Sequence, residues 1–275
     1  MNLLGLSGRL YGRVYNFLCG VHPHMRFLHY QWLSFKDLDR DLKRILPTLS
    51  GSILDVGCGS KPYEPWCSHV DAYTGVDIYA GDKVDYVIDP HKRWPFPDAS
   101  FDAVLCTQVI EHVEDPEMLM DEIHRALKPN GTVVLSAPFC YQEHGAPHDF
   151  RRFSVHGIKQ LLGDRFIIVE LTRQGGIGST LGTLYLHYVQ ESMNRNTFAR
   201  LLFGLSFPLW LLMCAVTNVL GLALDHVDST ESFYGNVLVV SRKTGGRVEP
   251  PAVPQRTPGA LRSGDRTAPP FERSS

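Results

Sequence analysis

Two short stretches of this 275-residue chain carry residue types that can do chemistry. The first is Asp55-Val56-Gly57-Cys58-Gly59, where an acid after an apolar run precedes a Gly-x-Gly turn. Glycine has no side chain to obstruct a ligand, so the main chain of such a turn can lie against one. The second stretch runs from Phe139 to Phe153 and holds His144, His148 and Asp149, which can accept a proton or orient an imidazole. The pattern predicts a ligand-binding turn and a separate loop for proton transfer.

The residues after the turn narrow the class of ligand. A dinucleotide fingerprint needs a third glycine three residues after Gly59, and this chain has Pro62 there. Gly75-Val76-Asp77 ends the next predicted strand, and a carboxylate in that place can accept hydrogen bonds from both hydroxyls of a ribose. We therefore expect a nucleoside with a charged tail and no pyrophosphate, which disfavours a nicotinamide dehydrogenase. Other roles stay open, since Asp55 could cap the turn and Asp77 could be an ordinary acid at a strand end.

Further blocks follow in a fixed order. They are Trp94-Pro95-Phe96-Pro97-Asp98, Ser100-Phe101-Asp102-Ala103-Val104, Glu111-His112-Val113-Glu114-Asp115-Pro116 and Leu127-Lys128-Pro129-Asn130-Gly131-Thr132. Together with the glycine turn and Asp77, this series resembles the class I S-adenosylmethionine-dependent methyltransferases. Within them it is similar to the methyltransferase type 11, or ubiquinone-methyltransferase-like, group. The resemblance extends from Leu46 to Phe153.

The resemblance implies S-adenosyl-L-methionine as the cofactor and gives a role to individual residues. Asp55, Gly57 and Gly59 would line its methionine part, and Asp77 would hold its ribose. Ile78 would pack on the adenine, Asp89 would accept from the adenine amino group, and Gln108 would lie near the sulfonium. Glu111 and His112 would either belong to the site or cap and brace the next helix.

The loop after the fifth predicted strand is where we expect the acceptor chemistry. A hydroxyl acceptor needs a base, and His148 and His144 are the candidates because histidine is the commonest base near neutral pH. Asp149 would orient an imidazole, or it would pair with Arg152 and pin the loop. A metal site made of Glu143, His144 and His148 is a third interpretation, and we predict no metal.

The elements that must position these residues are strands alternating with helices. Strands are expected at about Ser52–Val56, Ala72–Val76, Tyr86–Ile88, Ala103–Thr107, Thr132–Ala137, Phe166–Leu171 and Asn236–Ser241, after a leading helix over Phe35–Leu46 that is charged on one side. Alternation of this kind predicts an α/β fold with a parallel sheet covered on both faces. The resemblance implies a Rossmann-like, mostly parallel sheet of seven strands with an antiparallel last strand. The sequence itself predicts an apolar helical insertion between the last two strands.

The insertion is the feature most relevant to the acceptor. No charged residue occurs between Leu201 and Leu224, and Leu181, Leu184, Tyr185, Tyr188 and Val189 form a second apolar stripe at helical spacing. Both flanking strands belong to one sheet, so the chain must leave and return on the same side, and a single membrane span cannot do that. We expect a pair of apolar helices that either contacts a membrane surface or caps the domain or a twin subunit.

Composition sets the remaining expectations. The net charge of −2 gives no sign of a nucleic-acid partner, and six cysteines without Cys-x-x-Cys pairs disfavour zinc sites and a disulfide framework. No export signal is recognised, so we expect a cytoplasmic protein, peripheral or monotopic on the inner face of the cell membrane. We expect an amphipathic segment at 1–34, a methyltransferase domain at 35–244 with its insertion at about 178–228, and a disordered tail at 245–275. The oligomeric state stays open.

The sequence therefore predicts a methyltransferase that uses S-adenosyl-L-methionine to methylate oxygen or carbon on a small or lipid-linked acceptor. The alternative is a catalytically silent scaffold that binds the cofactor and associates with a membrane.

Overall fold

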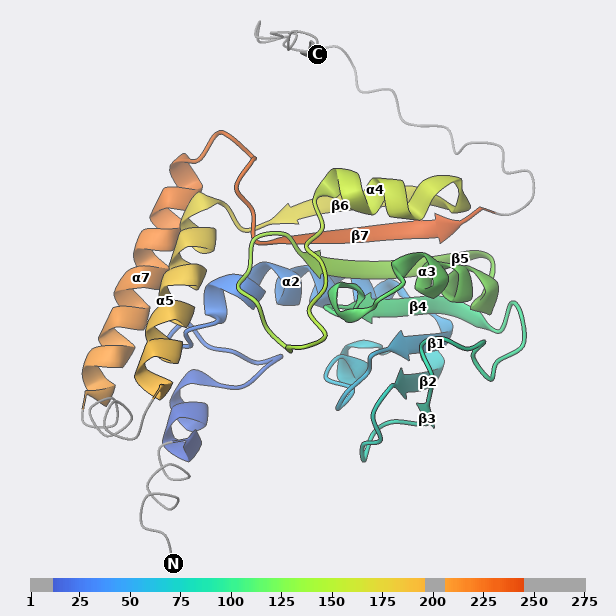
Figure 1. The fold of residues 1–275 in the computed structure, drawn as a ribbon, viewed down its shortest axis with the longest axis horizontal. Coiled ribbons are helices and arrows are strands. Elements are labelled where there is room, and N and C mark those ends of the chain that lie inside the picture. The colour runs from blue at the N-terminus through green and yellow to red at the C-terminus, as the bar shows by residue number, and fades with distance from the viewer. Residues whose placement is uncertain (1–11, 196–205, 245–275) are drawn as a thin grey trace, which may run out of the picture.

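The computed structural model describes residues 12–195 and 206–244, and a mixed sheet of seven strands forms its centre (Figure 1). Its strands are β1 (Gly51–Val56), β2 (Val70–Asp77), β3 (Tyr86–Val87), β4 (Phe101–Thr107), β5 (Leu127–Pro138), β6 (Phe166–Gln174) and β7 (Asn236–Lys243). Their order across the sheet is β3-β2-β1-β4-β5-β7-β6. β1 to β5 run parallel, and β7 runs antiparallel to both of its neighbours. The predicted fold class is confirmed.

Helices cover both faces of the sheet because successive strand residues point to opposite sides. On one face, Leu54 and Val104 pack with residues of α3 (Pro116–Ala126) and α4 (Val155–Leu162). On the other, Ile53 and Leu105 pack against Leu42 and its neighbours on α2 (Trp32–Ile45). Strands that are buried on both faces have nearly continuous apolar sequences, so such strands can be predicted from the sequence.

Two helices begin at residues suited to capping. The side chain of Asp115 accepts a hydrogen bond from the N–H of Met118, and Pro116 occupies the first turn of α3. The side chain of Ser154 accepts from the N–H of Gly157 at the start of α4. These starts fix the ends of the two loops that leave the carboxyl edge of the sheet.

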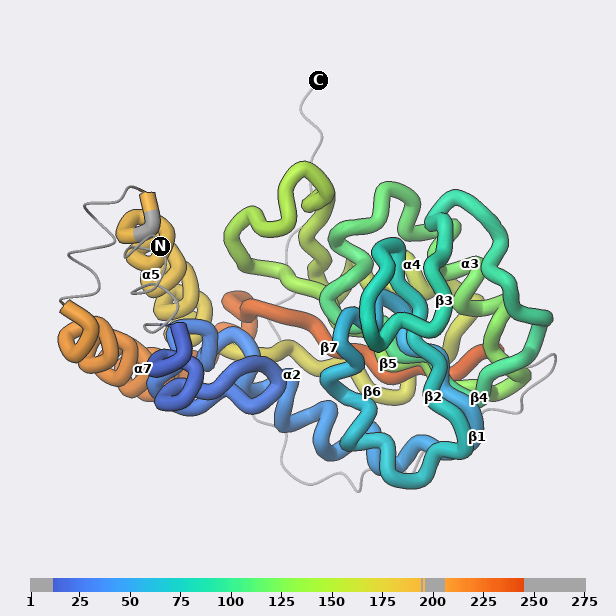
Figure 2. Tube along the Cα trace, turned by 90° about the horizontal axis from the view of Figure 1, so that it is seen from below, coloured from blue at the N-terminus to red at the C-terminus, as the bar shows by residue number. Residues whose placement is uncertain are grey.

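The insertion between β6 and β7 contains α5 (Ile177–Asn194) and α7 (Phe207–Val227), which pack side by side at the carboxyl edge of the parallel strands (Figures 1 and 2). A Cβ placed on Gly178 would lie 2.1 Å from the carbonyl oxygen of Gly221, so these backbones are in direct contact there. The two observed helices match the predicted pair, while part of the uncharged stretch, 201–205, lies outside the described residues.

Helix α7 leaves most of its apolar surface exposed. Among the described residues it is the one helix long and apolar enough to cross a membrane, with a mean hydropathy of 1.9 over a window of which 22% is buried. Leu209, Leu212 and Val216 are each about half exposed or more. A helix of a soluble core would be mostly buried, so this face is free to meet another surface.

The N-terminal segment joins the helical insertion. A helix at residues 12–19 brings Tyr15 and Cys19 into a small apolar cluster with Leu186, Trp210 and Cys214. Residues 1–11 and the predicted tail at 245–275 lie outside the described residues, and the predicted domain bounds remain predictions.

Helix α2, predicted as a leading helix that is charged on one side, buries its acids. Asp37, Asp39 and Asp41 are all buried, although the three acids span both sides of the helix. The end of β6 and the N-terminal segment cover them, and the contacts come from residues distant in the sequence, such as Gln174, Gly175 and His22.

Candidate active site

The glycine turn after β1 has the backbone that its sequence predicts. Gly57 has φ +69°, and a Cβ there would lie 2.4 Å from Cγ2 of Val109. Gly59 has φ +49°, and a Cβ there would meet nothing within 4 Å. The amides of Gly57 and Cys58 both donate to the carbonyl of Val76, at 2.8 and 3.0 Å, which ties the turn to β2. The turn is held from behind and open in front, so a ligand can lie against its main chain.

Asp77 is fixed beside this turn by two backbone amides. One carboxylate oxygen accepts from the N–H of Gly59 at 3.1 Å, and the other accepts from the N–H of Tyr79 at 3.1 Å. Each oxygen keeps a second lone pair, as a group that binds two ribose hydroxyls requires. Ile78 beside it is an exposed apolar side chain, 46% accessible.

A cavity of about 210 Å³, which we call the turn cavity, lies in front of these residues. Its wall includes Gly57, Asp77, Ile78, Trp94, Gln108 and His112. Four of the residues given a cofactor role by sequence, namely Gly57, Asp77, Ile78 and Gln108, thus share one cavity, and Gly59 contacts Asp77 at its side.

Asp55 and Asp89 lie elsewhere. Asp55 is buried behind the turn, where the hydroxyl of Tyr73 donates to its carboxylate at 2.7 Å, and burial raises its pKa to about 7. Asp89 accepts from Lys92 at 2.8 Å and from the N–H of His91 at 2.9 Å, and it is not part of the cavity wall. Their proposed cofactor contacts therefore stay predictions.

A second cavity, of about 430 Å³, lies between the sheet edge and the insertion, and we call it the loop cavity. Its wall includes Gln31 and Ser34 of α2, Tyr141 and His144 of the loop after β5, and Thr183 and His187 of α5. Gln108 and His112 line both cavities, so the two spaces meet at these side chains. The sequence did not reveal His187, because nothing near it in the chain forms a motif.

Polar side chains on the wall of the loop cavity hold one another in place. His187 Nε2 lies 3.0 Å from the hydroxyl of Tyr141, and its Nδ1 lies 2.6 Å from Nε2 of Gln142. Burial lowers the pKa of His187 to about 4, so its ring is neutral near pH 7. This wall offers hydroxyl, amide and imidazole groups to a polar molecule.

The two histidines predicted as bases take different places. His144 lines the loop cavity, whereas His148 is exposed and lies outside its wall. Asp149 contacts both of the residues that its two predicted roles involve. It pairs with the guanidinium of Arg152 at 2.5 and 2.7 Å, and its Oδ2 lies 3.4 Å from Nδ1 of His144. The Arg152 pairing holds the pKa of Asp149 well below its usual range.

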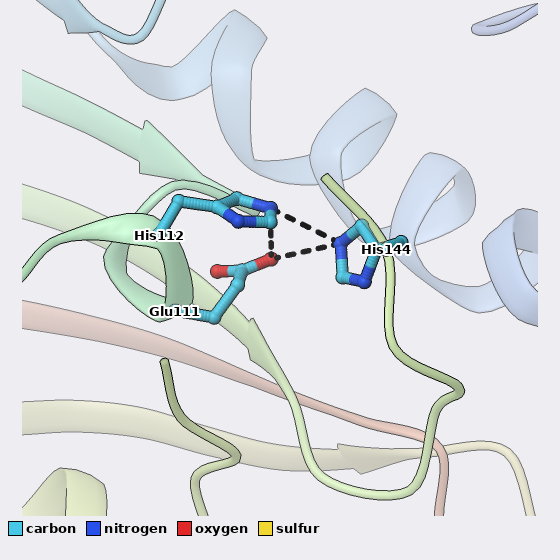
Figure 3. Close-up of side chains that lie close together, drawn as sticks. All are labelled: Glu111, His112 and His144. Carbon is cyan, nitrogen blue, oxygen red and sulfur yellow. Dashed lines mark hydrogen bonds and ion pairs between the residues drawn. The ribbon is translucent and has the colours of Figure 1, made fainter. Parts of the chain in front are cut away.

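Glu111, His112 and His144 converge at the edge of the loop cavity (Figure 3). The two Nε2 atoms lie 3.1 Å apart, and Glu111 Oε1 lies 3.8 Å from each of them. Glu111 is fully buried, neither of its carboxylate oxygens has a hydrogen-bond partner among the described residues, and burial raises its pKa to about 7. The cluster brings Glu111 and His112 together with His144 beside the loop cavity, and a role of Glu111 and His112 in the site stays a prediction.

The tautomers of the two histidines follow from their other neighbours. Nδ1 of His112 lies 2.6 Å from the carbonyl oxygen of His148, and Nδ1 of His144 lies 3.3 Å from the carbonyl of Gln142. A carbonyl only accepts, so both Nδ1 atoms carry hydrogen and both Nε2 lone pairs face the cluster. Three acceptor groups then meet without a donor, an arrangement that can share one proton or hold a divalent cation. Among the described residues, this potential metal group includes neither Glu143 nor His148.

A family model described as a methyltransferase domain matches residues 27–164, which is half of the chain and contains the turn, Asp77, Gln108 and the loop to Phe153. The chain belongs to this methyltransferase family. Its cofactor is S-adenosyl-L-methionine.

Relatives of known sequence support the same family. The chain is 29% identical over 133 residues to a ubiquinone biosynthesis O-methyltransferase of Pseudomonas paraeruginosa, which covers 37% of this chain and 57% of that protein. It is 33% identical over 118 residues to the enzyme of the same name from Xylella fastidiosa, covering 36% of this chain and 46% of that one. The chain thus spans about half the length of the curated relatives it matches.

The solved structures agree on the fold of this methyltransferase. The [4+2]-cyclase SpnF superposes with a TM-score of 0.51 at 20% identity, over 78% of this chain and 83% of that one. At this identity the likeness shows the fold alone.

The residues of the turn cavity fit S-adenosylmethionine. The main chain at Gly59 is open to a ligand, Asp77 has lone pairs for the ribose, and Ile78 offers an apolar surface for the adenine. Among the described residues no lysine or arginine side chain lines the turn cavity, which suits a ligand that carries a sulfonium and no phosphate.

Proposed function

We propose that this methyltransferase transfers the methyl group of S-adenosylmethionine to an oxygen or carbon atom of a small or lipid-linked acceptor. The observation that carries the proposal is the meeting of the turn cavity and the loop cavity at Gln108 and His112. The first cavity fits the cofactor, and the second has the volume and polar groups for an acceptor. Aligning a donor with an acceptor supplies much of the acceleration of such a transfer.

His144 is the side chain best placed to take the proton of a hydroxyl acceptor. It lines the loop cavity. Its Nδ1 carries hydrogen because that atom faces the carbonyl of Gln142, so the lone pair that can take a proton is on Nε2, beside Glu111 and His112. A base in this position contributes about 10²–10⁴-fold to a rate. In this proposal Glu111 stabilises the charge that forms on the imidazole.

The shape of α5 supports a lipid-linked acceptor. Ser179, Thr183 and His187 line the loop cavity, while Leu181 and Tyr188 on the same helix are exposed. An acceptor with a polar head and an apolar tail could therefore keep its head in the cavity and its tail against an apolar surface.

The same apolar surface supports a place at a membrane. We propose that α5, α7 and the adjoining N-terminal segment rest on the inner face of the cell membrane, with the catalytic domain in the cytoplasm. All six cysteines are free, which agrees with a reducing compartment.

The proposal is tested by incubating the purified full chain with methyl-labelled S-adenosylmethionine and a cellular lipid extract. We expect label in an organic-soluble product. His144→Gln should lower the rate by about 10²–10⁴-fold, and His148→Gln should leave it close to that of the unmodified chain. Absence of label in lipid and aqueous extracts, with S-adenosylhomocysteine still bound, would favour the catalytically silent scaffold.

A further inference from the structure

A ladder of side-chain hydrogen bonds runs from helix α2 to the meeting point of the two cavities. Gln174 Nε2 donates to Asp41 Oδ2 at 2.7 Å, and Asn236 Nδ2 donates to Gln174 Oε1 at 2.6 Å. Gln108 Nε2 donates to Asn236 Oδ1 at 2.9 Å and to Ser136 Oγ at 3.0 Å. Asp41, Gln174, Asn236 and Ser136 are all buried, so water cannot easily replace any of these partners.

Asp41 determines which group of each amide in the ladder donates and which accepts. A carboxylate only accepts hydrogen bonds, and the guanidinium of Arg40 donates to both of its oxygens. Gln174 must therefore turn its NH₂ group to Asp41 and its oxygen to Asn236. Asn236 must in turn present its NH₂ to Gln174 and its oxygen to Gln108. This order follows from the chemistry of Asp41 and does not depend on how amide oxygen and nitrogen atoms are assigned.

Gln108, the last amide of the ladder, has one polar atom that the ladder does not use. Both N–H bonds of the Gln108 side chain are used, so its Oε1 remains without a partner among the described residues. Ser136 cannot choose the orientation, because a hydroxyl can donate or accept. Gln108 itself has φ +55°, and its N–H donates to the carbonyl of Ser136 at 3.0 Å, so the backbone is held as well.

We propose that Asp41, Gln174 and Asn236 are positioning residues that hold Gln108 with its carbonyl oxygen, and not its NH₂ group, toward the meeting point of the two cavities. There the oxygen faces the methyl-sulfonium end of the cofactor. The inference rests on the proposed function for the placement of that end.

The orientation matters because the sulfonium is positively charged. A carbonyl oxygen can accept weak C–H···O bonds from its methyl group, and one such contact corresponds to about 2- to 5-fold in a binding constant. A reversed amide would point two N–H groups at a cation. Asp41 thus acts on the reacting end of the cofactor through three amides without contacting it.

Calorimetric titration with S-adenosylmethionine and with S-adenosylhomocysteine tests the inference on the full chain. The two ligands differ by one methyl group and its positive charge, so the ratio of their Kd values reports on the surroundings of the sulfonium. In Asp41→Asn the carboxamide can donate as well as accept, and the ladder can reverse. We expect S-adenosylmethionine to bind about 2- to 10-fold more weakly, with the affinity for S-adenosylhomocysteine unchanged.

A double variant restores the direction without restoring Asp41. In Asp41→Asn/Gln174→Glu the carboxylate stands at position 174, so Asn236 must again present its NH₂ group to position 174 and its oxygen to Gln108. The ratio of the two Kd values should then return to that of the unmodified chain. Asp37→Asn is the control, because Asp37 lies on the same helix but accepts from the N–H of Gly175 at 3.1 Å, outside the ladder. Its ratio should not change.

Three outcomes overturn the inference. They are unchanged affinities for both ligands in Asp41→Asn, an equal loss of affinity for both ligands in that variant, and a double variant that binds like the single one. Failure of the unmodified chain to bind either ligand is a different result, because it overturns the proposed function itself.

Discussion

At the scale of residues, the cofactor side and the acceptor side of the site differ in how the chain builds them. Gly57, Gly59 and Asp77 lie at the ends of two adjacent parallel strands, and the contact between Gly59 and Asp77 closes the arrangement. On the acceptor side, Glu111 lies close to His144 of the loop after β5. The path of this loop does not follow from any pattern in its local sequence.

The two acids predicted to bind the nucleoside can be separated by substitution. Asp77→Ala should weaken S-adenosylhomocysteine binding by about 10- to 100-fold, because hydrogen bonds to a charged acceptor contribute about 1.5–3 kcal/mol. Asp89→Ala is the matched comparison, and we expect a smaller loss than in Asp77→Ala, since Asp89 lies outside the wall of the turn cavity and already accepts from Lys92 and from the N–H of His91. Calorimetry measures both, and equal losses would show that the ligand extends beyond the turn cavity.

The difference between the two sides also explains what the sequence could predict. The turn, Asp77 and Gln108 lie at the ends of β1, β2 and β4, which are neighbours in the parallel part of the sheet, so a pattern along the chain places them at one edge. His148 lies only four residues after His144, yet it is exposed and does not line the loop cavity. His187 and the Gln174–Asn236 pair enter the site from the insertion and the last strands, and only tertiary packing brings them there.

At the scale of elements, α2 shows how far packing overrides a charge pattern. The sequence predicts a helix that is charged on one side, but its three acids are buried by parts of the chain that lie far away in the sequence. Asp37 and Asp41 accept hydrogen bonds from the end of β6. Asp39 has a carboxylate oxygen without a hydrogen bond, and its Oδ1 lies 4.0 Å from Nδ1 of His22.

The unfavourable burial of Asp39 predicts a dependence of stability on pH. Burial raises the pKa of Asp39 to about 7 in the folded chain, and burial lowers the pKa of His22 to about 4, so the ring brings no positive charge at neutral pH. The folded state therefore holds the Asp39 proton more tightly than the unfolded state does. This contribution to stability is complete below about pH 4 and is lost as the pH rises to about 7.

Asp39→Asn removes the ionisable group and should raise the free energy of unfolding at pH 8 by about 1–3 kcal/mol. Urea denaturation at pH 5 and pH 8 measures the change, and the gain should be smaller at pH 5. Asp37→Asn on the same helix should destabilise the chain, because Asp37 is paired with Lys36 and Arg40 at 2.6 Å. A variant at Asp39 that loses stability at pH 8 would show that the carboxylate is paired in solution.

At the scale of the whole molecule, the helical insertion stands at one end of the sheet (Figure 2). One side of α5 forms the far wall of the loop cavity, and the outer side of the helix pair exposes apolar residues. The sequence predicted a pair of helices because the strands before and after the insertion belong to one sheet, so the chain must leave the sheet and return to it on the same side. It could not predict that the same helix would also form the wall of the acceptor space.

Charged substitutions on the outer face test contact with a membrane. Leu212→Glu/Val216→Glu should lower binding to vesicles of phosphatidylcholine and phosphatidylglycerol by about 10-fold or more, because burying one such side chain contributes about 1.5–3 kcal/mol. Val169→Glu is the control, since Val169 is similarly exposed but lies on the edge strand β6. Vesicle flotation measures both. A double variant that floats like the unmodified chain but changes its oligomeric state would assign this face to a twin subunit.

The most direct test of the whole account is an experimental structure of the full chain bound to S-adenosylhomocysteine. We expect the ribose hydroxyls on Asp77 and the sulfur beside Gln108, at the point where the turn cavity and the loop cavity meet. A ligand bound away from the turn cavity, or a sulfur that faces away from the loop cavity, would contradict the central claim that these two spaces are the donor and acceptor sites of one methyltransferase.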